Sequence, residues 1–257
     1  MKVTKDGFKD RQLHIEDYLQ MVSAEQKEYA EVSAHQRIAE NNDIITDFQA
    51  DSLMEQILHK DNLNKAYKKV KSNKGAGGVD GMSVDELLGF LKDNQKQLIQ
   101  KIKDGKYKPN PVRRVEIPKE TKGEFRKLGV PTVVDRVFQQ AITQVLSPIY
   151  EKQFSENSFG FRPDKGAHEA LKQCQVNVND GYVYVVDMDL EKFFDTVCQS
   201  KLMEVLSRTI KDGRVISLIH KYLNAGVISR GMFEKTEVGM PQGGPLSPLL
   251  SNIMLNE

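Results

Sequence analysis

VYVVDMDLEKFFD, residues Val183 to Asp195, is one of two stretches that decide the fold of this chain. Its Tyr and Val residues predict a strand over 182–190, because these residue types suit a pleated, half-buried surface. Asp187 and Asp189 would share one face of that strand, since side chains two residues apart point the same way. Mg²⁺ prefers such carboxylates together with substrate phosphates, and two Mg²⁺ ions can activate a 3′-hydroxyl. An Asp-x-Asp pair alone is weak evidence, because turn-forming or capping aspartates are commoner.

GMPQGGPLSPLLSN, residues Gly239 to Asn252, is the second deciding stretch. Its glycines predict a tight turn that opens a helix, with Ser247 as the N-cap residue and Pro248 in the first helical position. The apolar positions of this helix continue until the sequence ends at Glu257. We therefore expect the chain to be truncated within a longer domain.

Length and composition set broad limits on the protein. The chain has 257 residues and an apolar fraction of 39%, which suits one large domain or two modest ones. Cys174 and Cys198 lack CxxC spacing, so we expect reduced thiols in a cytoplasmic protein rather than a disulfide or zinc site. The N-terminus lacks the apolar stretch of a signal peptide, and no apolar run approaches the ~20 residues needed to cross a bilayer. We expect no membrane partner.

Positive charge is concentrated in two segments, although the formal net charge is only +1. Residues 59–74 hold six lysines and one aspartate, and residues 101–127 hold ten basic and four acidic residues. Such segments would attract a polyanion such as a nucleic-acid strand. A solvated helix face is the alternative explanation for each cluster.

The remaining pattern predicts a helix-rich chain. Expected helices cover 11–48, 53–70, 87–102, 132–151, 164–176, 200–211 and 214–224, and the second and third follow capping boxes at Ser52 and Ser83. Val112–Pro118 alternates, with Val115 and Ile117 on one face, and predicts a half-buried strand with a hairpin across Lys122 and Gly123. Four glycines between Lys71 and Gly81 predict a loop.

Several long strings, in the same order along the chain, resemble bacterial group II intron reverse transcriptase-maturases. The resemblance runs from about Leu53 to the end, and its strings are GAGGVDGM (75–82), RRVEIPK (113–119), RKLGVPTVVDRVFQQA (126–141), FSENSFGFRP (154–163), VDMDLEKFFDTV (186–197) and GMPQGGPLSPLLSNIML (239–255). It implies an α+β fold: right-hand polymerase fingers with a partial palm, helix-rich with small antiparallel sheets. The expected domains are an N-terminal helical extension over 1–50, fingers over 51–170 and a truncated partial palm over 171–257.

The resemblance also implies catalytic and nucleotide-binding residues. Asp189 would bind the catalytic Mg²⁺, with the Leu190 carbonyl as a further ligand. The residues implied to contact the deoxynucleoside triphosphate are Lys119, Arg126, Phe194, Gln242 and Gly243. Phe194 would be the steric gate that rejects a 2′-hydroxyl, although a core aromatic is the alternative. Asp195 is expected to be structural or accessory.

Nucleic-acid contacts are expected from a second group of residues, namely Arg113, Arg114, Lys71, Lys74 and Gly77. The two arginines interrupt an apolar strand, which favours a role toward the template or the triphosphate. The resemblance implies that the loop Gly75–Gly81 contacts the template. A flexible surface connection is an equally weighted alternative.

The expected activity is RNA-directed DNA synthesis by a group II intron protein, with intron RNA binding and a maturase role. Expected partners are intron RNA, an RNA template with a DNA primer, deoxynucleoside triphosphates and a second copy of the chain, bound through an exposed palm or fingers surface, in a bacterial cytoplasmic ribonucleoprotein. The sequence contains no Tyr-x-Asp-Asp motif, so we expect this chain to be inactive by itself. The alternatives are a non-catalytic splicing cofactor, or a retron, diversity-generating or CRISPR-associated reverse transcriptase.

Overall fold

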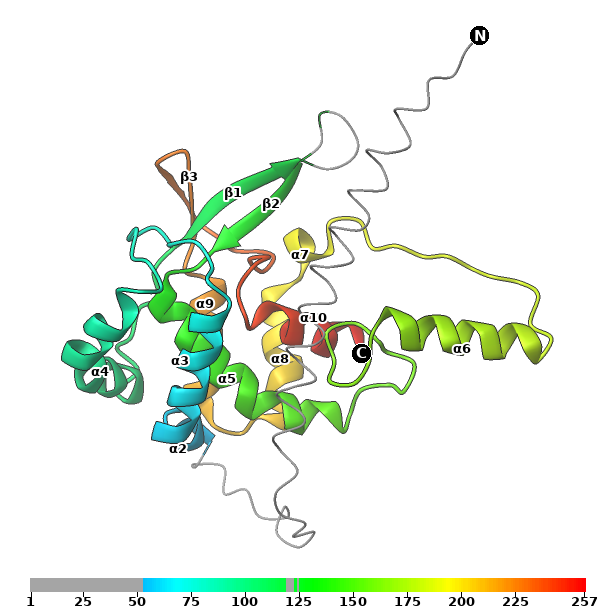
Figure 1. Cartoon of the computed structure of the whole chain (residues 1–257), viewed down its shortest axis with the longest axis horizontal. Coiled ribbons are helices and arrows are strands. Elements are labelled where there is room, and N and C mark those ends of the chain that lie inside the picture. The colour runs from blue at the N-terminus through cyan, green and yellow to red at the C-terminus, as the bar shows by residue number, and fades with distance from the viewer. Residues whose placement is uncertain (1–52, 119–122, 124) are drawn as a thin grey trace, which may run out of the picture. The chain divides into compact units, whose positions relative to one another are not determined.

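The computed structural model describes residues 53–118, 123 and 125–257, and the predicted extension over 1–50 lies outside this part (Figure 1). The chain divides into two compact units, which are described separately. The described part of the first unit is 156–185, and that of the second is 53–155 with 186–257. The predicted fingers and palm boundary at residue 170 falls within a helix of the first unit and remains a prediction.

The first unit contains a loop followed by α6 (Ala167–Asn179), close to the helix predicted over 164–176. None of the α6 side chains is buried. In the loop, the buried Arg162 donates from Nη1 to the Ser158 carbonyl at 2.9 Å. Phe161 is 69% exposed and adopts a left-handed backbone with φ of 52°.

The second unit is built on a helical core. Its helices are α2 (Leu53–Ile57), α3 (Lys60–Ser72), α4 (Leu87–Lys103), α5 (Val133–Glu151), α7 (Phe193–Thr196), α8 (Gln199–Thr209), α9 (Gly213–Leu223) and α10 (Ser247–Leu255). Helix α5 packs against α2, α3 and α10, and it buries side chains along most of its length (Figure 1). One continuous hydrophobic core results, to which these helices contribute fully buried residues such as Met54, Leu87, Ile142, Leu206, Ile219 and Leu250.

One predicted helix is divided into two, and one predicted N-cap residue is wrong. The helix expected from Leu53 through Val70 is interrupted after Ile57, because His59 caps α3 by accepting a hydrogen bond from the Asp61 amide at 3.3 Å. Ser247 is the first residue of α10 rather than its cap. Its hydroxyl donates to the Pro241 carbonyl at 2.6 Å and so holds the preceding turn.

The capping box predicted at Ser83 is confirmed. The Ser83 amide and hydroxyl both donate to the Glu86 carboxylate, at 2.8 and 2.6 Å, and the Glu86 amide donates to the Ser83 hydroxyl at 3.4 Å. The hydrogen bonds to Ser83 lower the pKa of Glu86. This reciprocal pair forms just before α4 begins at Leu87.

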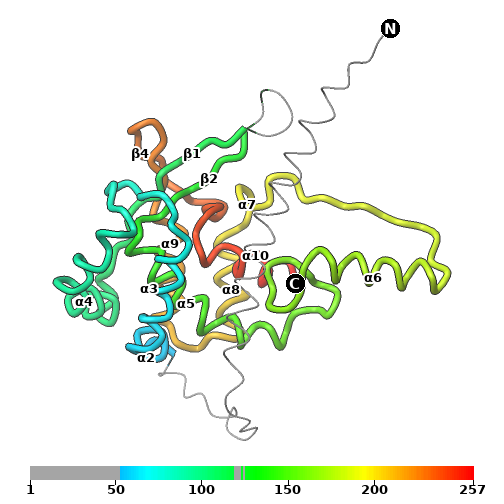
Figure 2. Tube along the Cα trace, viewed as in Figure 1, coloured from blue at the N-terminus to red at the C-terminus, as the bar shows by residue number. Residues whose placement is uncertain are grey.

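The sheet has four strands: β1 (Val112–Pro118), β2 (Phe125–Val130), β3 (Val227–Ser229) and β4 (Met232–Glu234). Their order is β2-β1-β3-β4, so segments far apart in the sequence lie side by side (Figure 2). The β1–β2 and β3–β4 pairs are antiparallel, whereas β1 and β3 are parallel. The helix-rich α+β fold is therefore confirmed, with a mixed sheet in place of the purely antiparallel sheets that were predicted.

The strand predicted over Val112–Pro118 is confirmed to the residue. Its burial changes along its length instead of alternating, because Val112 is buried at the base while Ile117 is 44% exposed near the hairpin end. The predicted burial of Ile117 is therefore wrong.

The strand predicted over 182–190 is also wrong. These residues follow no regular secondary structure, and Tyr184 and Met188 are 93% and 86% exposed. A strand requires a neighbour to bond its backbone, and within the described residues the sheet contains no such neighbour for this segment. Favourable residue types alone do not form a strand here.

Cys174 and Cys198 are both free and exposed. Among the residues that the structure describes, no helix combines the length and apolar character required to cross a membrane.

Candidate nucleotide and nucleic-acid site

The segment 239–244 is hydrogen-bonded to the short helix α7. The Gly239 amide donates to the Val197 carbonyl at 2.8 Å, and the Met240 amide donates to the Phe194 carbonyl at 2.7 Å. Gly239 has a φ of 79°, and a Cβ there would lie 2.7 Å from the Phe194 carbonyl oxygen. Only glycine combines this backbone conformation with so close an approach, so Gly239 allows the segment to dock beside Phe194.

The same segment docks on the outer edge of β2. The Gly129 amide donates to the Gln242 carbonyl at 2.7 Å. A Cβ on Gly243 would lie 2.8 Å from the Gly129 carbonyl oxygen, and one on Gly244 would lie 2.4 Å from Gln139 Oε1. Gly243 therefore lets its backbone approach that of Gly129 more closely than a Cβ would allow.

Arg126 lies on β2, opposite Ile117 of β1, and is exposed. Arg126 lies three positions before Gly129, which is about 10 Å along a strand. The structure thus places Gln242 and Gly243 against the strand that carries Arg126. Lys119, the other residue predicted to contact the triphosphate, lies outside the described residues.

Phe194 is half-buried and packs partly against the hydrophobic core. Its ring makes an edge-to-face contact with Phe193 at a centroid distance of 5.7 Å. Helix α7 begins after Lys192, whose φ is 50°. The ring is therefore fixed by its neighbours while part of it faces solvent, an arrangement that suits either the predicted gate or a core aromatic.

Asp189 and Leu190 lie in the exposed segment that precedes α7, and Asp187 is exposed as well. Within the described ranges, no three His, Cys, Asp or Glu side chains gather closely enough to hold a metal ion. One carboxylate with water and phosphate ligands is too small a set for a pair of Mg²⁺ ions. The donors among the described residues therefore do not by themselves fit a two-metal centre.

The glycine-rich loop Gly75–Gly81 is pinned to the fold. Arg113 donates from Nε and Nη2 to the Gly77 carbonyl, at 3.1 and 2.9 Å, and Arg136 donates from Nη2 to the Ala76 carbonyl at 2.6 Å. A Cβ on Gly78 would lie 2.6 Å from the Cα of Thr132. These contacts hold the loop against β1 and the start of α5. Arg113 thus has a structural partner in addition to its predicted role.

Two of the remaining predicted nucleic-acid contacts flank this loop. Lys71 is in the last turn of α3, and Lys74 follows it with a φ of 46°, both side chains being exposed. Arg114 is half-buried on β1. Their contact with nucleic acid remains a prediction.

A buried polar cluster at the base of the hairpin was not predicted. The Tyr107 hydroxyl donates to Asp135 Oδ1 at 2.7 Å, while Asp135 Oδ2 accepts from the Thr132 hydroxyl at 2.7 Å and the Asn110 amide at 3.2 Å. Burial raises the pKa of Asp135 and also that of Tyr107. The sequence signal was Thr132 three residues before Asp135, a capping pair at the start of α5.

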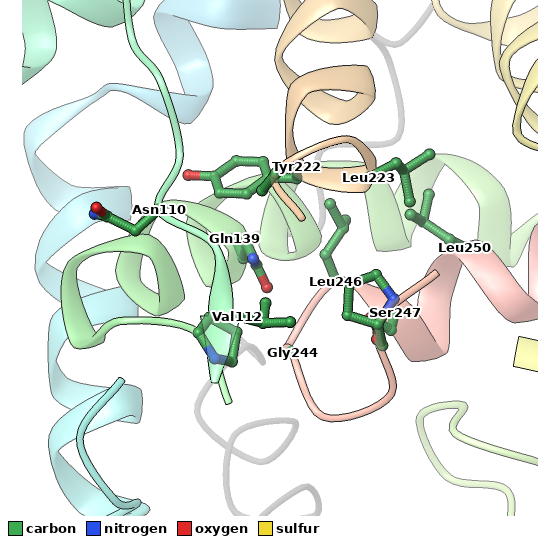
Figure 3. A pocket seen from close by; sticks show the side chains of 12 residues that line it. Asn110, Val112, Gln139, Tyr222, Leu223, Gly244, Leu246, Ser247 and Leu250 are labelled. Atoms are coloured by element: carbon green, nitrogen blue, oxygen red, sulfur yellow. The ribbon is translucent and has the colours of Figure 1, made fainter. Parts of the chain in front are cut away.

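The cluster adjoins a small cavity of about 20 Å³, room for roughly one water molecule. Figure 3 shows Gln139, Tyr222 and Leu246 around it. The hydroxyl of Tyr222 is buried and lacks a hydrogen-bond partner within the described part of the chain. The cavity is far too small to hold a nucleotide, so we interpret it as part of the structural packing beneath the candidate site.

Residues 117–257 match the family model described as "Reverse transcriptase (RNA-dependent DNA polymerase)". This range contains Arg126, Asp189, Phe194 and the segment 239–244.

Two curated relatives cover most of the chain. It is 38% identical over 222 residues to the group II intron-encoded protein LtrA of Lactococcus lactis subsp. cremoris, covering 86% of this chain and 37% of that protein. It is 39% identical over 211 residues to the protein YkfC of Escherichia coli K12, covering 80% of this chain and 55% of that protein. The chain thus spans between about a third and just over half the length of these relatives.

A solved structure supports the fold. A chain of the partial Cas6-RT-Cas1–Cas2 complex superposes with a TM-score of 0.54 at 23% identity, covering 79% of this chain and 34% of that one.

Proposed function

The chain belongs to the reverse transcriptase (RNA-dependent DNA polymerase) family, and we propose that it forms the nucleotide- and template-holding part of a group II intron enzyme that copies RNA into DNA. The observation that carries this proposal is the docking of the segment 239–244 between β2 and α7. That docking ties the segment that carries Gln242 to α7, which carries Phe194, and to β2, which carries Arg126. These residue types would suit a deoxynucleotide pocket.

Arg126 would bind the triphosphate of the incoming nucleotide. A guanidinium offers several donors in a planar fork, and its hydrogen bonds to phosphate are strengthened by charge. Its exposed position on β2 leaves the side chain accessible to a ligand. Lys119, by its place in the sequence, would contribute a second cation to the same phosphates.

Phe194, Gln242 and Gly243 would shape the pocket around the sugar and base. Phe194 would exclude a 2′-hydroxyl by bulk, held in place by Phe193 and by the Met240 amide. The Gln242 backbone is fixed to Gly129, so the pocket wall is rigid where the new base pair would lie. Such preorganised contacts position the substrate before any chemistry occurs.

Asp189 would contribute one carboxylate and Leu190 one carbonyl oxygen toward Mg²⁺. Because the described donors do not complete a two-metal centre, we expect the 257-residue chain to be inactive by itself.

The proposed nucleic-acid partners are intron RNA and an RNA template with a DNA primer, held in part by Arg113, Arg114, Lys71, Lys74 and the pinned loop around Gly77. A second candidate function is that of a splicing cofactor that binds intron RNA without polymerising. The similarity to an intron-encoded protein and the two basic segments support this second function as well as they support the first. A cytoplasmic ribonucleoprotein and a homodimer remain part of the proposal.

RNA-templated primer extension with deoxynucleotides tests the proposal, comparing the full-length gene product with the 257-residue chain. We expect extension by the full-length product, and its loss at limiting deoxynucleotide when Arg126 is replaced by Ala. Absence of extension by the full-length product, together with intact RNA binding, would favour the splicing cofactor instead.

A further inference from the structure

The carboxylates of the described four-stranded sheet lie on one face only, whereas each face carries two cations, Arg114 and Lys127 being on the face with the carboxylates. Residues that pair directly across strands share a face, so the register groups Arg113 and Arg126 with Val115, Leu128, Ile228 and Phe233. The acidic residues of the described strands, Glu116 and Glu234, lie on the other face by the same register. We call the first the cationic face. It combines apolar and positively charged side chains and carries no carboxylate from these strands.

One row of the cationic face crosses all four strands. Val130 of β2 pairs with Arg113 of β1, Arg113 pairs with Ile228 of β3, and Ile228 pairs with Phe233 of β4. Neighbouring strands lie about 4.8 Å apart, so Phe233 stands about 10 Å from Arg113. The aromatic ring of Phe233 therefore ends this row on the β4 side of the Arg113 cation.

Phe233 is supported from below and open above. A Cβ on Gly226 would lie 2.4 Å from Cε2 and 2.6 Å from Cζ of the ring, so the ring rests on the backbone at the start of β3. The Gly226 carbonyl accepts from the Val112 amide at 2.9 Å, which ties that support to β1. Phe233 nevertheless remains 60% exposed. A supported and exposed ring is a platform for another flat group.

The opposite face is already covered at the base of the hairpin. A Cβ on Gly129 would lie 2.8 Å from Val112 Cγ2 and 3.3 Å from Pro241 Cβ, which shows how closely the 239–244 segment packs there. Val115, Leu128 and Ile228 on the cationic face are only half-buried. Beyond that base both faces carry exposed side chains, and on the cationic face these are Ile117, Arg126 and Phe233.

We propose that Phe233 is a stacking platform for an unpaired base of single-stranded RNA, which lies across the cationic face with its phosphates toward Arg113 and Arg126. The inference rests on the proposed function, because it extends the RNA contacts of the same enzyme to β4. Charge complementarity selects the occupant: an anionic strand meets two cations and none of the sheet's carboxylates, while apolar side chains between them accommodate bases.

Binding of a fluorescent oligouridylate to the full chain tests the proposal. Base stacking on an aromatic residue is worth about 1–3 kcal/mol, so Phe233→Ala should weaken binding roughly 5- to 100-fold. Phe125→Ala is the matched control, because Phe125 is 52% exposed on the opposite face of the same sheet. It should change binding less than about twofold. Inorganic polyphosphate, which has no bases, should bind both variants equally.

The absence of tryptophan from the chain allows a direct spectroscopic test. Phe233→Trp introduces a single indole on the platform, and Phe125→Trp places one on the opposite face. Oligouridylate should quench the first indole and leave the second unchanged. Because the indole itself can stack, this pair also tests the platform if Phe233→Ala fails to fold.

Equal effects of the two alanine variants, or weaker polyphosphate binding by Phe233→Ala, would overturn the platform. Loss of self-association in Phe233→Ala with unchanged RNA binding would identify a protein-docking surface and would also overturn it. Either result leaves primer extension by the full-length product intact, so the proposed function would stand. If the unmodified chain binds no RNA, the platform and the proposed RNA contacts of this chain both fall.

Discussion

The Met240 amide donates to the Phe194 carbonyl at 2.7 Å, and this bond joins the glycine-rich segment 239–244 to the residue proposed to select deoxynucleotides. The bond requires Gly239 to lie against α7, with no room for a Cβ. The position of Phe194 is therefore set in part by a residue 45 places later in the sequence.

Gly239→Ala should destabilise the fold by more than backbone strain alone. A left-handed conformation costs a non-glycine residue about 1–2 kcal/mol, and overpacking adds about 1–3 kcal/mol. Gly231→Ala is the matched control, because Gly231 has a φ of 80° against 79° for Gly239 but faces open space. Denaturant unfolding should show a larger loss for Gly239→Ala. Equal losses would mean that the close approach to Phe194 carries no energetic weight.

Arg126→Ala should raise the KM for deoxynucleotides in the full-length enzyme about 10- to 100-fold, because a charge-assisted phosphate contact is worth about 1.5–3 kcal/mol. Lys127→Ala is the control, since Lys127 is the next residue on β2 and its side chain lies on the opposite face, paired with Glu116. Both side chains are exposed, so unfolding should hardly change. Steady-state kinetics with similar KM values for the two variants would remove Arg126 from the triphosphate site.

Phe194→Val should let the full-length enzyme incorporate ribonucleotides, improving their use relative to deoxynucleotides about tenfold or more, because the smaller side chain leaves space for a 2′-hydroxyl. Phe193→Val is the control, because both rings pack partly on the core and contact each other. Single-nucleotide extension with paired ribo- and deoxynucleotides measures the ratio. Discrimination that survives in Phe194→Val would place the gate at another residue and leave Phe194 as a core aromatic.

Sequence patterns predicted the helices and strands that are specified by residues close together in the sequence. Strand Val112–Pro118 and the helices corresponding to α4 and α5 were predicted within about a residue, because alternation, capping and apolar periodicity all agreed there. Strands β3 and β4 were missed because each has only three residues, and β3 exists through its pairing with β1, some 115 residues earlier. The strand expected over 182–190 failed for the converse reason, having the right residues and no neighbour among the described strands.

The candidate site was predictable in part. The family resemblance pointed to Phe194 and Gln242, and the structure places the segments that carry them together through backbone hydrogen bonds that no pattern encodes. The cluster of Tyr107, Asn110 and Asp135 escaped prediction because Tyr107 and Asn110 lie in the loop before β1, whereas Asp135 lies in α5. A buried aspartate cannot be distinguished from a surface cap by sequence spacing alone.

The buried Asp135 carboxyl should make the fold less stable as pH rises through the acidic range. Burial raises its folded-state pKa above the ordinary value of 3.8. Below 3.8 the group is protonated whether the chain is folded or unfolded, and it contributes no pH dependence. As pH rises, the unfolded chain ionises first, so stability falls until the folded-state pKa is passed and is constant above it.

Asp135→Asn removes this titration. The free energy of unfolding of the unmodified chain, compared with that of the variant, should therefore fall as pH rises from 3.8 to the folded-state pKa of Asp135. Urea unfolding at a series of pH values measures the difference. A difference that rises with pH would mean that the hydrogen bonds from Tyr107, Thr132 and Asn110 outweigh burial and hold Asp135 ionised.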